Sequence, residues 1–158
     1  MRRTAAMRRM VALLAFTAVL TAVSVGTAAA GRFAGSSTGG VTLTATLLGE
    51  NEVPPADPDG SGTAVVTLNS GQGVVCFEIS VSNIALPATG AHIHQGEAGV
   101  NGPIVVTLTP PDESGTSSGC VEADRGLLKD IRKNPAGYYV NVHTTEFPGG
   151  AIRDQLSK

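Results

Sequence analysis

Apolar and polar residues alternate with a period of two through much of the chain after residue 40. From Val41 to Leu47, apolar residues alternate with Thr42, Thr44 and Thr46, and a similar run extends from Val75 to Val81. Because successive side chains of a strand point to opposite faces, this pattern predicts strands with one buried and one solvent-facing side. Half-buried strands of this kind are typical of antiparallel sheets.

Short strands and turns account for most of the remaining sequence. Three prolines exclude segment 53–60 from a central strand, and 110–119 is expected to be a long polar loop. One helix is expected from Asp124 to Lys133, capped by Asp124 and limited by Pro135. Further strands are expected at Ala64–Leu68, Ala91–Gln95, Pro103–Leu108, Tyr138–Thr144 and Ala151–Leu156.

Seven or more short strands and one short helix, in about 118 residues, predict an all-β fold. We expect an antiparallel β-sandwich, either Greek-key and superoxide-dismutase-like or immunoglobulin-like. The absence of long helices from the pattern excludes βαβ enzyme folds.

The first 30 residues have the composition of a signal peptide. Four arginines precede an uncharged run from Met10 to Val25, and Ala28, Ala29 and Ala30 supply small residues for cleavage. The alternative, an uncleaved membrane anchor, requires a longer apolar stretch. We therefore expect a signal peptide at 1–30, a flexible lead-in rich in Gly and Ser at 31–40, and one domain at 41–158. The mature protein is then secreted, in an extracytoplasmic location.

Loss of the signal peptide makes the protein acidic. It removes four of the 11 basic residues and none of the 13 acidic ones, which leaves a net charge of −6. An acidic chain without a basic stripe is poorly suited to nucleic acid or an anionic membrane surface. The expected partner is therefore an extracellular protein or a small ligand, which the sequence does not identify.

Two cysteines, Cys76 and Cys120, are present in a chain bound for an oxidising compartment. This setting predicts a disulfide between them. The alternative, a pair of metal thiolates, lacks the close cysteine spacing of such sites.

Five motifs in order resemble those of the CHRD (chordin) domain family. One departure from the family pattern is Ala151, where the closing motif usually has an acidic residue. The resemblance covers about Val41 to Leu156 and implies a β-sandwich in an extracellular setting, as in single-domain bacterial-type members. The growth-factor antagonism of animal chordins is not carried over to this chain. The motifs are Glu50–Pro55, Ala91–Gly96, Asn101–Val106, Tyr139–Thr144 and Gly150–Arg153.

All three histidines of the chain lie in these motifs. His92 and His94 are two residues apart on an expected strand and share a face, and His143 lies on another expected strand, in phase with Asn141. If these strands are neighbours, three imidazoles converge, and they suit Zn(II) or Cu(II). Glu97 is the nearest carboxylate that could ligate the ion or orient a histidine. The alternative is that the histidines bind no metal and brace loops, through hydrogen bonds to the turns formed by Gly96, Gly99 and Gly102 or to the turn at 147–150.

The His-x-His pair on a strand also resembles, in part, the copper/zinc superoxide dismutases. The paired metal site of that family uses six histidines and an aspartate, and this chain has three histidines. A dinuclear site cannot be built here, which leaves a mononuclear copper or zinc site as the alternative.

Acidic residues near the first strand form a second group of candidates. Glu50 and Glu52 flank Asn51 and are expected to share a strand face, as an acid/base pair or as calcium ligands with the aspartates at 57 and 59. The alternative is solvated loop charges. Arg153 is expected to pair with Glu52 or Glu50 and to tie the closing strand to the first loop.

The sequence therefore favours a secreted binding or interaction module over an enzyme, with the threonine face from Thr42 to Thr46 as one contact surface. The alternative is a mononuclear metalloprotein that uses His92, His94 and His143. Motifs for a serine hydrolase or a nucleotide-binding loop are missing from the sequence.

Overall fold

A computed structural model describes residues 40–158 of the chain. The expected signal peptide and all but the last residue of the expected lead-in lie outside the described residues. The helical elements are α1 (Arg125–Lys133) and the short 3-10 turns η1 (Gly49–Asn51) and η2 (Pro135–Gly137). The strands are β1 (Val41–Leu48), β2 (Ser61–Asn69), β3 (Val74–Ser82), β4 (Gly90–Gln95), β5 (Ile104–Leu108), β6 (Thr116–Glu122), β7 (Tyr138–His143) and β8 (Ile152–Gln155).

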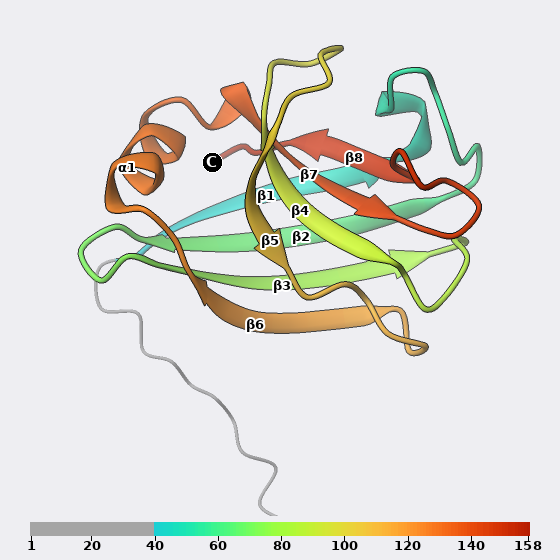
Figure 1. Cartoon of the computed structure of the whole chain (residues 1–158), viewed down its shortest axis with the longest axis horizontal. Coiled ribbons are helices and arrows are strands. Elements are labelled where there is room, and N and C mark those ends of the chain that lie inside the picture. Colours follow the sequence, from blue (N-terminus) through green and yellow to red (C-terminus); the bar gives the residue numbers. More distant parts are fainter. Residues whose placement is uncertain (1–39) are drawn as a thin grey trace, which may run out of the picture. The chain divides into compact units, whose positions relative to one another are not determined.

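The eight strands form one antiparallel sheet in the order β5-β4-β7-β8-β1-β2-β3-β6. The sheet turns back on itself, so that β4 and β5 cross over β1, β2 and β3 (Figure 1). The two layers are joined where β8 pairs with β1, at Arg153 opposite Leu48. The predicted all-β antiparallel fold with one short helix is thus confirmed, with both layers formed by a single, nearly closed sheet.

The hydrophobic core lies between the two layers. In β3, Val75, Phe77, Ile79 and Val81 are all buried, as the alternation predicts, while Glu78 is exposed. Ile93 of β4 and Val140 of β7 belong to the same core from the opposite layer. Each fully buried side chain of this size contributes about 1.5–3 kcal/mol, so the packed inner faces are the main source of stability.

Helix α1 forms where the sequence predicts it. The Asp124 side chain accepts a hydrogen bond from the backbone N–H of Leu127 at 2.9 Å and so caps the first turn. Leu128 and Ile131 face the core, and Pro135 begins η2 directly beyond the helix.

Strand β6 contradicts the expectation of a polar loop through residues 110–119. The segment from Thr116 to Glu122 pairs along its whole length with β3, at the edge of the sheet. Most of its side chains are exposed, because a strand at the edge of the sheet needs few apolar residues. It therefore lacks the alternation by which the other strands are recognised.

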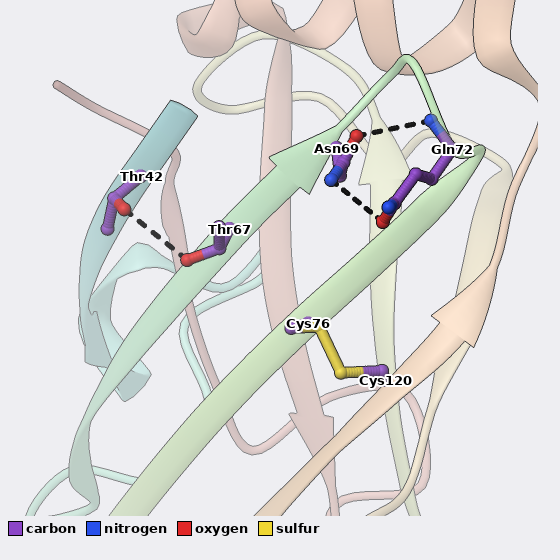
Figure 2. The surroundings of a disulfide bond; sticks show 6 residues. All are labelled: Thr42, Thr67, Asn69, Gln72, Cys76 and Cys120. Atoms are coloured by element: carbon purple, nitrogen blue, oxygen red, sulfur yellow. Dashed lines mark hydrogen bonds between the residues drawn. A yellow bond between two sulfur atoms is a disulfide. The ribbon is translucent and has the colours of Figure 1, made fainter. Parts of the chain in front are cut away.

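The predicted disulfide joins β3 to this edge strand. Cys76 and Cys120 lie directly opposite each other in the β3–β6 register and are bonded (Figure 2). The outer face of β1 and β2 lies beside them, where Thr42 and Thr67 approach to 3.3 Å between their hydroxyl oxygens. The threonines at 42, 44 and 46 are all exposed, as the alternation predicts.

Candidate metal centre

The outer face of β4 and β7 has a buried layer of polar side chains on the side of the sheet away from the core. His92 and His94 extend from β4 to this face, because Ala91 and Ile93 fill the core on the other side. Strand β7 places His94 opposite Tyr139 and His92 opposite Asn141. His143 follows two residues after Asn141 on β7 and lies opposite Gly90 at the start of β4.

The structure brings the three histidines together. One ring nitrogen from each of His92, His94 and His143 lies within 4.8 Å of the other two. The ring centroids are 4.9 Å apart for His92 and His143, 5.6 Å for His92 and His94, and 6.1 Å for His94 and His143. Their function as metal ligands stays a prediction.

Two of the rings are oriented by backbone carbonyl groups. His94 Nδ1 lies 2.9 Å from the carbonyl oxygen of Gly102, and His143 Nδ1 lies 3.1 Å from that of Pro148. A carbonyl oxygen only accepts hydrogen bonds, so each Nδ1 must bear the proton and donate. In both neutral rings the Nε2 atom therefore has its lone pair free.

Three buried nitrogens of this cluster have no hydrogen-bond partner among residues 40–158. They are Nε2 of His94, Nε2 of His143 and Nδ1 of His92. A buried polar atom without a partner costs about 1–3 kcal/mol, and such atoms are uncommon in folded proteins. Three such atoms lie in this one cluster, and others belong to the neighbouring Glu52, Asn141 and Arg153 side chains.

Burial keeps the three rings neutral. Burial, together with the nearby His143 and His94, lowers the pKa of His92 to about 4. Burial also lowers the pKa of His94 and of His143, although their hydrogen bonds to Gly102 and Pro148 oppose the shift. At neutral pH all three imidazoles are thus in the unprotonated form that a metal ion requires.

Space beside the cluster is kept free by Gly90. A Cβ atom at this position would lie 3.1 Å from His92 Cε1 and 3.4 Å from His143 Cδ2. A larger residue would therefore press on two of the three rings.

The carboxylates named from the sequence are placed differently from the histidines. Glu97 is exposed and does not belong to the cluster, which within residues 40–158 contains only the three histidines. Glu50 and Glu52 do not share a strand face, because η1 turns the chain between them and leaves Glu50 exposed while Glu52 is buried. Asp57 is buried and accepts a hydrogen bond from the backbone of Gly60, and the calcium-site hypothesis gains no support from the described residues.

Arg153 ties the closing strand to the first loop, as the sequence predicts. Its Nε atom lies 3.9 Å from a carboxylate oxygen of Glu52 and donates to the carbonyl oxygen of Asn51 at 2.7 Å. Asn141, between Arg153 and His92 in the sheet, lies close to the Glu52 carboxylate, and both side chains face Gly150. Burial raises the pKa of Glu52 to about 7 even though the Arg153 charge and the nearby Asn141 side chain lower it.

Sequence reasoning missed the stacking of Tyr139 on His94. The signal for it is that Tyr139 is in phase with Asn141 and His143 on the same strand. The hydrogen bonds to the carbonyl groups of Gly102 and Pro148 lie at turns that the loop-bracing alternative names.

The CHRD domain family model matches residues 43–156, which is most of the chain. The chain belongs to the CHRD domain family. No curated protein and no solved structure matches it, so the likeness to superoxide dismutases rests on the His-x-His pair alone. The CHRD domain is of an extracellular type, in agreement with the disulfide between Cys76 and Cys120. Among residues 40–158, no helix has the length and apolar character needed to span a bilayer.

Proposed function

We propose that this CHRD-domain protein binds one divalent transition-metal ion, zinc or copper, outside the cytoplasm. The ligands are His92, His94 and His143. The observation that supports this proposal is a close cluster of the three histidines, each with one buried ring nitrogen that no group of residues 40–158 hydrogen-bonds.

Loop bracing alone does not account for this arrangement. The hydrogen bonds to Gly102 and Pro148 do brace loops, but each uses only the Nδ1 atom of its ring. His92 braces nothing through its buried Nδ1. A metal ion satisfies the remaining nitrogens of all three, and a carbonyl group on the far nitrogen of a ligating histidine is the usual way in which its orientation is held.

A single ion would be held by one ring nitrogen from each histidine, and such nitrogens lie within 4.8 Å of one another. His94 and His143 are each held by a backbone carbonyl group, whereas Nδ1 of His92 has no partner within residues 40–158. His92 is therefore the least constrained of the three proposed ligands.

A site with three histidine ligands leaves the fourth position of a tetrahedral ion open, because closed structural sites use four protein ligands. Water or another small ligand fills that position in mononuclear sites of this kind. Within the described residues, the cluster offers no fourth side chain to occupy it.

Elemental analysis tests the proposal. The purified protein is incubated with Zn(II) or Cu(II), desalted and analysed for bound metal. We expect one ion per chain in the wild type and in Glu97→Ala, a matched control that removes an exposed carboxylate three residues from His94. His94→Ala and His143→Ala should retain none. Wild-type protein that leaves the column metal-free would refute the metal site.

A second candidate function is an interaction module that uses the threonine face of β1. Thr42, Thr44 and Thr46 form an exposed polar row that no other part of residues 40–158 covers. Thr46→Lys should weaken binding of an extracellular protein partner, and Thr107→Lys, exposed on β5, should leave it unchanged. Equal binding by both variants would rule out this surface.

A further inference from the structure

His94, Gly102 and Tyr139 contact one another in a ring, and the hydrogen bond from His94 Nδ1 is one of these three contacts. The carbonyl oxygen of Gly102 accepts from His94 Nδ1 at 2.9 Å, and the N–H of the same residue donates to the Tyr139 hydroxyl at 3.1 Å. The Tyr139 ring in turn stacks on the His94 ring, with centroids 4.8 Å apart and an interplanar angle of 9°. Gly102 and Tyr139 thus fix both the plane and the tautomer of one imidazole.

The loop that supplies Gly102 is packed closely against the end of β4. A Cβ atom at Gly102 would clash with the carbonyl oxygen of Gln95, so only glycine fits without moving the backbone. Gly96 is less tightly packed, since a Cβ there would lie 3.2 Å from Tyr139 Cε1. The close packing leaves Gly102 little freedom to move away from His94.

Arg153 covers the other face of Tyr139. Its guanidinium carbon lies 4.6 Å from the centroid of the tyrosine ring. The guanidinium is itself held by the carbonyl oxygen of Asn51 at 2.7 Å and the Asn101 side chain at 2.8 Å. Tyr139 is therefore enclosed between His94 and Arg153, and both Tyr139 and Arg153 are at most 2% exposed.

The three histidines differ in this respect. His94 has a hydrogen bond and a parallel stacking partner, and His143 has a hydrogen bond to a turn. The buried Nδ1 of His92 has no hydrogen bond to any of residues 40–158. A metal site gains affinity when a ligand is already in its bound orientation, because less freedom is lost on binding.

We propose that Tyr139 is a positioning residue of the metal centre, which presents Nε2 of His94 as the fixed ligand around which the other two assemble. Gly102 helps to position the same ring, because its backbone N–H donates to the tyrosine hydroxyl and its carbonyl oxygen accepts from the histidine. The inference rests on the proposed metal-binding function.

Two substitutions separate the stack from the hydrogen bond. Tyr139→Leu removes both, and Tyr139→Phe keeps the stacked ring but removes the acceptor for the Gly102 N–H. The matched control is Tyr138→Leu, which removes the adjacent tyrosine of β7 from the hydrophobic core on the opposite face. Affinities for Zn(II) and Cu(II) are measured by competition with a chelator, after circular dichroism has established that each variant is folded.

We expect Tyr139→Leu to weaken metal binding by about 10- to 100-fold, as for other partners that orient a ligating histidine. Tyr139→Phe should lose several-fold, and Tyr138→Leu should bind as the wild type does. Nitrogen NMR of the metal-free protein gives a second readout. His94 should bear its proton on Nδ1 in the wild type and in Tyr139→Phe, and should show a mixture of tautomers in Tyr139→Leu.

The outcomes distinguish the two proposals. If the wild type binds metal and folded Tyr139→Leu and Tyr139→Phe bind it equally well with His94 unchanged, the positioning function is wrong and the metal site stands. If the wild type binds neither metal, the proposed function fails and the positioning function of Tyr139 fails with it.

Discussion

Glu52 is the residue whose ionisation the fold opposes most clearly. The side chain is 5% exposed, and burial raises its pKa from 4.5 to about 7. Within the part of the chain that the structure describes, the only charge beside it is the Arg153 guanidinium, whose Nε lies 3.9 Å from a carboxylate oxygen. Between pH 4.5 and about 7, the folded protein thus keeps a proton that the unfolded chain releases, so the contribution of Glu52 to stability falls as the pH rises.

Substitution Glu52→Gln should remove this pH dependence. The amide retains an oxygen that can accept from Asn141, but it does not ionise. The difference in free energy of unfolding, variant minus wild type, should rise between pH 4.5 and about 7, by at most about 3 kcal/mol. Urea unfolding of both proteins across this range measures the difference, from which the histidine titrations cancel. A constant difference would show that Glu52 ionises normally in the folded protein.

At the level of elements, β6 depends on its attachment to β3. It is an edge strand with mostly exposed side chains, so it buries little apolar surface of its own. Its ladder with β3 and the bond between Cys76 and Cys120 hold it to the sheet. The disulfide closes a loop that includes β4 and β5, and it therefore restricts the unfolded chain as well.

The double variant Cys76→Ala/Cys120→Ala should be less stable by about 4 kcal/mol, the chain-entropy cost for a loop of about 45 residues. Replacing both cysteines avoids a free thiol that could join two molecules. Denaturant unfolding of the variant, and of the wild type with and without reductant, measures the loss. An unchanged midpoint in the double variant would show that the ladder alone determines the stability of this edge.

For the whole molecule, the proposed metal site links ion binding to folding. His92 and His94 lie on β4, and His143 lies on β7, more than 40 residues further along the chain. The three proposed ligands therefore come together only in the folded chain. An ion that binds the folded state alone adds about 2.7 kcal/mol at a free concentration 100 times its dissociation constant.

Zinc should therefore raise the melting temperature of the wild type by an amount on the order of 10 °C at that concentration. Magnesium should have no such effect, because it binds oxygen ligands and not imidazole. Differential scanning calorimetry measures the shift, and His94→Ala is the control in which zinc should change nothing. A similar shift in His94→Ala would locate the bound zinc elsewhere.

Much of the fold could be predicted because it follows from patterns among residues that are close together in the sequence. Alternation between Val41 and Leu47 and between Val75 and Val81 marks strands whose inner side chains are buried, and Asp124 marks the start of the helix. Strand β6 could not be found in this way, because its pairing with β3 and not its own composition makes it a strand.

The sequence by itself determined that His92 and His94 share one face, since side chains two apart on a strand point the same way. It also placed His143 in phase with Tyr139 and Asn141. Only the tertiary structure decided that β7 lies beside β4, that loops bring the carbonyl groups of Gly102 and Pro148 to two of the rings, and that Glu52 is buried while Glu50 is not. These relations join residues distant in the chain, and they arise when the sheet turns back on itself to bury its apolar face, a step that no local pattern encodes.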